Sequence, residues 1–140
     1  MTATGKPAQI FDALMVKAEA MVLRSPAIPL ALPDIKFDPA VSATDGKYIE
    51  VAYFPNRPAW EGLAAGELSQ GILQLTVVWP RGAGLVGPLE VVDGIKTHFA
   101  KGTVMVSGTT KVKVSAEPWA AAPLIGDHET RTPVSISWTA

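Results

Sequence analysis

The segment from 72 to 99 constrains the fold of this chain more than any other part. It consists of an apolar strand pattern (ILQLTVVWP), a glycine-rich turn (RGAGLVG) and an amphipathic helix pattern (PLEVVDGIKTHF). Gly82, Gly84 and Gly87 give the turn the spacing G-x-G-x-x-G, which is the fingerprint of a dinucleotide-binding turn. The chemistry of the protein therefore depends first on whether this spacing marks a nucleotide site.

The fingerprint makes demands beyond its three glycines. The helix must begin inside the glycine run, and a parallel strand must follow with an acidic residue about 20 positions further on. Here Pro88, which suits a first helical position, predicts a helix that begins only after the last glycine. The charged residues of the following segment KGTVMVSGTTKVKV are all lysines. We interpret the turn as a plain connection between strand and helix, and predict no bound cofactor.

The length and composition set broad limits on the protein class. A chain of 140 residues predicts a single domain over 1–140 with a substantial core. The net charge of −1 indicates no general attraction to nucleic acid or to anionic membranes. Hydrophobic residues make up 48% and charged residues 18%, which indicates that some apolar surface is buried against a partner. The absence of cysteine excludes disulfides and zinc-thiolate sites.

The N-terminal segment does not resemble a secretory signal. Asp12, Lys17 and Glu19 interrupt its apolar residues, and the spacing is amphipathic rather than continuously apolar. No window reaches the roughly 18 to 20 apolar residues that a membrane-spanning helix requires. We therefore expect a soluble protein without a membrane partner.

Hydrophobic periodicity predicts two helices and six strands. The helices are expected at about 7–24 and 89–100, and the strands at 28–33, 47–54, 71–79, 103–106, 111–115 and 133–138. The buried helical stripes are expected to be Ile10, Leu14, Ala18 and Met21 in the first helix, and Leu89, Val92, Ile95 and Phe99 in the second. This order predicts an α+β fold, with a mainly antiparallel β-sheet and two helices packed on one face.

Two long connections, 55–70 and 117–130, show little strand or helix pattern. Both are rich in proline and alanine, and each carries one tryptophan, Trp60 in the first and Trp119 in the second. Large aromatic side chains on loops are frequent anchors of protein interfaces. We therefore predict that Trp60, Leu63 and Leu68 in the first connection, and Trp119 in the second, contact another subunit.

The candidate catalytic and metal-binding residues are isolated from one another. His128 lies between Asp127 and Glu129, but sequence neighbours point in different directions and no second ligand motif is present. His98 lies near a helix end, where a solvated or dipole-facing role is usual. No serine lies in a G-x-S-x-G elbow, and Lys111 and Lys113 project from one side of a strand, as a solvated face does. We predict no catalytic, cofactor-binding or metal site.

Several motifs together resemble a known family. They are the G-x-L-S-Q-G-x-L-Q-L-x-V strand (66–77), the P-x-G-x-G turn (80–84), the F-x-K-G-T helix exit (99–103) and the closing PVSISW strand. With the N-terminal amphipathic helix, this layout resembles the tail terminator-like proteins of long-tailed bacteriophages and prophages over roughly residues 8–139. The motifs are structural rather than catalytic.

The resemblance implies a role without enzymatic chemistry. Such proteins assemble as a ring, usually a hexamer, on the head-proximal end of the tail tube, where they stop polymerisation and meet the head–tail connector. The implied partners are copies of the chain itself, the tail tube protein and the connector protein, with no recognition of a nucleic-acid sequence. The implied location is the virion tail, assembled in the cytoplasm of the host bacterium.

Other functions remain open at this stage. A head-completion role is one alternative, because small phage proteins diverge enough for head-completion and tail-completion proteins to be confused. A different class is a small α+β protein that encloses an apolar ligand or an active-site pocket, which would need an inward-facing ionisable cluster. A nicotinamide-binding enzyme is a further alternative, and it depends on the glycine turn alone.

Overall fold

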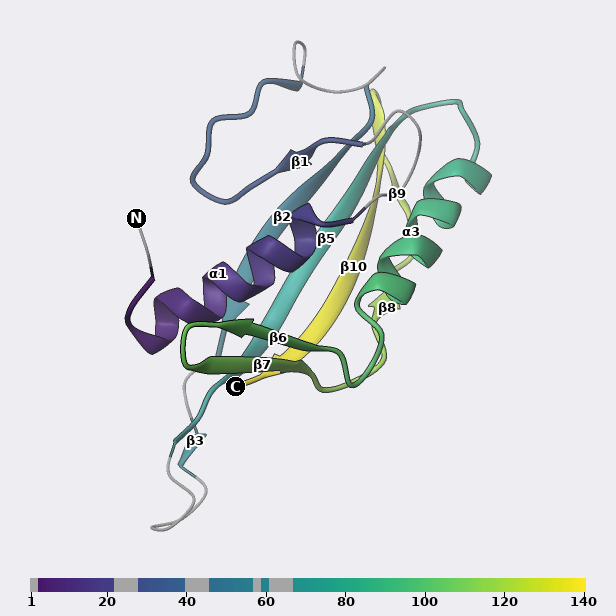
Figure 1. Cartoon of the computed structure of the whole chain (residues 1–140). Helices are drawn as coiled ribbons and strands as arrows, with labels where there is room; N and C mark the ends of the chain where they lie inside the picture. Colours follow the sequence, from purple (N-terminus) through teal and green to yellow (C-terminus); the bar gives the residue numbers. More distant parts are fainter. Residues whose placement is uncertain (1–2, 22–27, 40–45, 57–58, 61–66) are drawn as a thin grey trace.

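A computed structural model describes residues 3–21, 28–39, 46–56, 59–60 and 67–140. These residues form one large twisted sheet, with helices α1 (Lys6–Glu19) and α3 (Val86–His98) on the same face, and a second sheet of two short strands (Figure 1). The sheet is mostly antiparallel, so the predicted α+β class and the placement of both helices on one face are confirmed.

Three long strands make the centre of the sheet. They are β2 (Tyr48–Pro55), β5 (Gln70–Pro80) and β10 (Glu129–Thr139), and β5 pairs antiparallel with the other two. The short strand β1 (Leu30–Ala31) pairs parallel to β2 at one edge of the sheet, within the strand expected at 28–33. On the other side β10 pairs with β7 (Thr110–Val114), which forms a hairpin with the edge strand β6 (Val104–Ser107).

Helix α1 is shorter than its sequence pattern predicts. It ends at Glu19 rather than near Arg24, which lies outside the described residues together with Ser25. The last turn tightens as the backbone N–H of Met21 donates to the carbonyl of Ala18 at 3.2 Å, an i→i−3 bond typical of helix ends.

Helix α3 begins earlier than predicted from Pro88, which had placed the start of the helix after Gly87. It starts at Val86, so Gly87 and Pro88 both lie in its first turn. A proline is tolerated throughout that turn because the first four N–H groups of a helix have no partner within the helix. Leu89 is 43% exposed and does not belong to the buried stripe, which contains Val92, Ile95 and Phe99 as expected.

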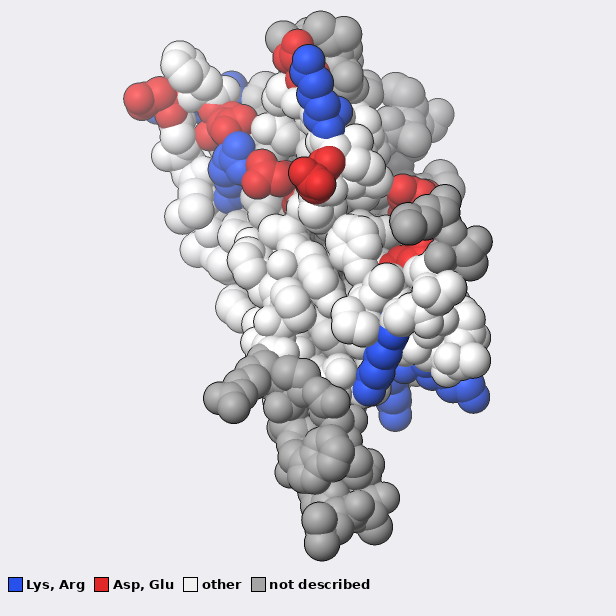
Figure 2. All heavy atoms as spheres, turned by 90° about the vertical axis from the view of Figure 1, so that its left-hand side faces the viewer, with Lys and Arg blue, Asp and Glu red and all other residues white. Residues whose placement is uncertain are grey.

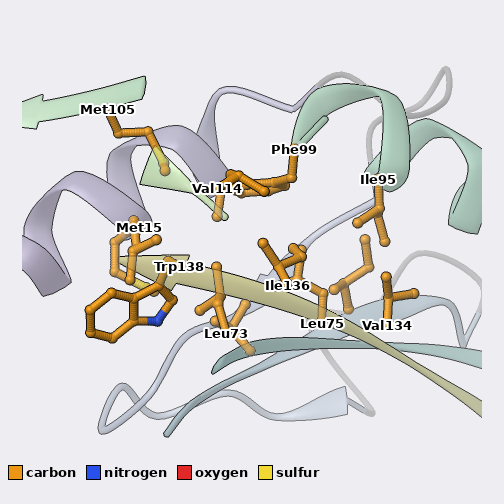
Figure 3. Packing of buried hydrophobic residues seen from close by; sticks show 14 of the residues in the cluster. Met15, Leu73, Leu75, Ile95, Phe99, Met105, Val114, Val134, Ile136 and Trp138 are labelled. Carbon is orange, nitrogen blue, oxygen red and sulfur yellow. The ribbon is translucent and has the colours of Figure 1, made fainter. Parts of the chain in front are cut away.

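The core lies between the helices, the β6–β7 hairpin and one face of the central strands. Leu73 and Leu75 of β5 lie beside Ile136 and Val134 of β10, in register with them. Figure 3 shows Phe99, Ile95 and Met15 of the helices directed toward these strands, with Met105 and Val114 reaching in from the hairpin. The alternation predicted for β2, β5 and β10 thus places every second residue in this core.

The connection 117–130 is not the free loop that the sequence predicted. It carries β8 (Trp119–Ala120) and β9 (Leu124–Ile125), and both pair antiparallel with β10. The segment runs along the edge of β10 as an interrupted strand, because the register slips between β7 and β8 and again between β8 and β9. Pro118 and Pro123 lie in these interruptions, where a residue without an N–H donor is tolerated.

The connection 55–70 also contains strand structure that the sequence pattern did not reveal. Strands β3 (Ala59–Trp60) and β4 (Glu67–Leu68) pair antiparallel as a separate small sheet. They continue the β2–β5 hairpin past the end of the main sheet, and Figure 1 shows β3 lying away from both helices. The N–H of Ala140 donates to the carbonyl of Ser69 at 2.8 Å, at the base of this extension. We call the strand pair β3 and β4 the β3–β4 arm.

Candidate interaction surfaces

Each glycine of the G-x-G-x-x-G spacing has a structural reason in this fold. Gly82 and Gly84 have φ angles of +86° and +82°, a backbone region that side chains disfavour. Gly87 lies against Trp79, and a Cβ atom there would be 2.8 Å from the indole Cζ2. The two strands that pair with β5 are both antiparallel to it, so the parallel neighbour of a dinucleotide-binding fold does not flank β5.

The two histidines lie in different settings. The Nε2–H of His98 donates to the carbonyl of Lys17 at 2.6 Å, which joins α3 to the last turn of α1. His98 therefore satisfies one of the carbonyls that a helix end leaves free, which agrees with the dipole-facing alternative rather than the solvated one. His128 is exposed in the turn before β10. Among the described residues, no group of three acidic or histidine side chains is arranged to hold a metal ion.

One small cavity lies between α1 and the base of the β3–β4 arm. Its volume is about 190 Å³, and its lining includes Pro7, Ile10, Tyr53 and Trp138. The described residues that line it include no carboxylate, histidine or lysine. An enzyme pocket would need an ionisable cluster, whereas Tyr53 is the single titratable side chain among the described residues that line this cavity.

Among the described residues, no helix lies on the face of β2, β5 and β10 that points away from α1 and α3. We call this face the open face. Its side chains include those of Glu50, Ala52, Phe54, Ile72, Gln74, Thr76, Arg131, Pro133, Ser135 and Ser137, with Trp119 of β8 beside Ser135. Tyr48 and Val78 lie on the same face beside Arg131 but are buried. Most residues of the open face are half-exposed, and Phe54 and Trp119 are 52% and 56% exposed. Two large aromatic residues thus flank a mostly uncharged sheet surface.

A charged cluster lies at one end of the open face. The Nη1 of Arg131 donates to Glu50 Oε2 at 3.0 Å, and its Nε donates to Glu129 Oε1 at 2.9 Å. The hydrogen bond to Glu50 raises the pKa of Arg131 above its usual value, so the guanidinium stays charged. Two carboxylates around one guanidinium give the cluster a net negative charge.

Of the four predicted interface residues, the three that the structure describes lie on two different surfaces. Trp119 is exposed, as an anchor requires, but it lies on a paired strand rather than on a loop. Trp60 belongs to β3 and Leu68 to β4, and Leu63 lies outside the described residues. The structure therefore places Trp60 and Leu68 in the arm and Trp119 on the open face, as two separate surfaces.

A third exposed surface lies on the β6–β7 hairpin; the sequence predicted its solvated lysines, Lys111 and Lys113, but its exposed valines were missed. Val104 and Val106 are 55% and 59% exposed, and they lie opposite the exposed Lys113 and Lys111 in the register of the hairpin. The alternation of strand residues could have revealed it, since Met105 and Val112 point inward and their neighbours must point outward. We call Val104, Val106, Lys111 and Lys113 the outer face of the hairpin.

The molecule viewed from the side that bears α1 shows few charges in its middle. In Figure 2 the charged side chains lie mainly near the top of the view and at its lower right.

In the described part of the chain, no helix has the length and apolar character needed to cross a membrane.

Comparisons with known proteins agree with the fold and with the sequence motifs. A family model described as "Phage tail terminator protein" matches residues 9–138. A solved structure that bears no functional name has 26% sequence identity and a TM-score of 0.73, and the similarity covers 92% of this chain and 94% of the other. A search of curated proteins finds no match.

Proposed function

The chain belongs to the phage tail terminator family, and from this membership we propose that it forms a ring, a hexamer, on the head-proximal end of the tail tube. The ring ends polymerisation of the tube and presents a surface to the head–tail connector protein. The partners are copies of the chain itself, the tube protein and the connector. The protein acts as a component of the virion tail, assembled in the cytoplasm of the host bacterium.

The β3–β4 arm is the structural feature that best supports the proposed ring. It continues the β2–β5 hairpin beyond the main sheet and away from the helices, where a neighbouring subunit can meet it (Figure 1). A ring is built from head-to-tail contacts in which two different surfaces of each subunit meet. We propose that Trp60 and Leu68 of the arm, together with Leu63 from the segment between them in the sequence, contact the next subunit, with Trp60 as the central anchor.

Exposed apolar side chains give further support. Phe54, Trp119, Val104 and Val106 are each more than half exposed in the single chain. Surfaces of this kind, rimmed by polar residues, are typical of protein interaction sites. The family is a structural one, which favours a role without catalysis.

Electron microscopy of negatively stained protein tests the proposal directly. The purified chain is imaged at high concentration alone, and after mixing with tail tubes assembled from the cognate tube protein. We expect closed rings, and tubes that carry one ring at a single end and stop growing. Tubes that keep elongating without a cap would contradict the proposed function.

A further inference from the structure

The outer face of the β6–β7 hairpin combines apolar and basic side chains. Val104 and Val106 alternate with Lys113 and Lys111 across the two strands, and all four are exposed. The segment 101–116 contains three lysines and no carboxylate, so the basic charge is not neutralised within it. The inner side of the same hairpin is buried in the core, which fixes the direction of the outer face.

The hairpin has a defined position on the helical side of the molecule. The Ser107 hydroxyl donates to Asp12 Oδ2 at 2.7 Å, and the Thr110 hydroxyl donates to Gln9 Oε1 at 2.7 Å. Both acceptors lie on α1, so the hairpin is held over the helix rather than in the plane of the central strands (Figure 1). Its outer face therefore points away from the core on the side opposite to the open face.

The open face has the complementary chemistry. Phe54 and Trp119 supply exposed aromatic surface, and the cluster of Glu50, Glu129 and Arg131 supplies a net negative charge. The outer face of the hairpin supplies aliphatic side chains and two positive charges. Neither surface matches itself, because like charges would meet.

We propose that the outer face of the hairpin of one copy packs on the open face of the next copy. Val104 and Val106 lie against Phe54 and Trp119, and the lysines face the carboxylates at the end of the open face. Two different surfaces on opposite sides of one subunit give a head-to-tail contact, the kind that closes a ring. This inference rests on the proposed ring. It assigns the two surfaces that form most of each contact between subunits, in addition to the contact made by the arm.

Two charge-inserting variants test the two surfaces separately. Val106→Glu places a carboxylate in the outer face of the hairpin, and Trp119→Glu places one in the open face; both positions are exposed, so the fold is retained. We expect each variant to weaken every contact by about 30-fold or more and to leave monomers in analytical ultracentrifugation. Val86→Glu on α3, at a position exposed to a similar or greater degree, is the matched control and still forms rings.

Crosslinking then establishes which surface meets which, since the natural chain has no cysteine. A chain carrying both Val106→Cys and Trp119→Cys, treated with a short bis-maleimide, should give a ladder of covalent oligomers. Equal mixing of the two single-cysteine chains should give heterodimers, and either chain alone should give none.

Each outcome of these experiments supports or overturns the assignment. Rings that persist in both charge-inserting variants overturn the surface assignment and leave the ring proposal standing. A double-cysteine chain that forms rings but gives no ladder of crosslinked oligomers also overturns the surface assignment and leaves the ring proposal standing. A wild-type chain that stays monomeric at high concentration and on tail tubes overturns the ring itself, and this assignment with it.

Discussion

Single residues of the core determine how α3 is held on the sheet. Phe99 is fully buried at the end of α3 and points toward the central strands (Figure 3). We expect Phe99→Ala to lower the free energy of unfolding by about 3–5 kcal/mol, because a large cavity replaces the ring. Denaturant unfolding measures the loss, with the half-exposed Leu89→Ala as the matched control. A loss below about 1 kcal/mol for Phe99→Ala would show that this helix end is not packed.

The two tyrosines allow a test of packing through their ionisation. Burial raises the pKa of Tyr53, and burial together with Glu129 and Glu50 raises the pKa of Tyr48. A raised pKa means that the unfolded chain releases its phenolic protons first, so stability is complete below about pH 10 and falls as the pH rises through the folded pKa. We expect phenolate absorbance to show both groups titrating above free tyrosine. Tyr53→Phe should reduce the alkaline loss of stability, and titration of both groups at the ordinary value would contradict this account.

At the scale of elements, the turn between β5 and α3 depends on close packing of Gly87 against Trp79. A Cβ atom at position 87 would lie 2.8 Å from the indole, which is tighter than carbon atoms allow. We expect Gly87→Ala to destabilise the protein by about 1–3 kcal/mol through overpacking. The matched control is the same change in a Trp79→Leu background, where the smaller side chain leaves room. Equal losses in both backgrounds would show that the indole contact is not the cause.

At the scale of the whole molecule, the arm tests the proposed assembly. Trp60 lies in β3 of the arm, outside the main sheet. If it anchors the contact between subunits, Trp60→Ala should weaken each contact by about 2 kcal/mol or more. We therefore expect loss of rings in light scattering, with the melting temperature of the monomer unchanged. A variant that still forms rings and caps tails would contradict the arm contact, and one that unfolds would place Trp60 in the core.

The regular elements of this protein could be predicted from its sequence. Alternation placed Leu73, Leu75 and Val77 on one face of β5, and the helical stripe placed Ile10, Leu14 and Ala18 in the core. Both patterns are local, because a strand repeats every two residues and a helix every 3.6 residues. The family motifs, which also lie within these elements, pointed to the tail terminator family for the same reason.

The irregular segments and the interaction surfaces were decided only by the tertiary structure. The segment 117–130 has no strand periodicity, yet β8 and β9 form because β10 offers an unpaired edge on that side. The open face and the outer face of the hairpin exist because both helices pack on one side of the sheet and the hairpin folds over α1. Alternation along a strand predicts which side chains share a face of the sheet. Whether helices or other strands cover that face depends on contacts between residues far apart in the chain.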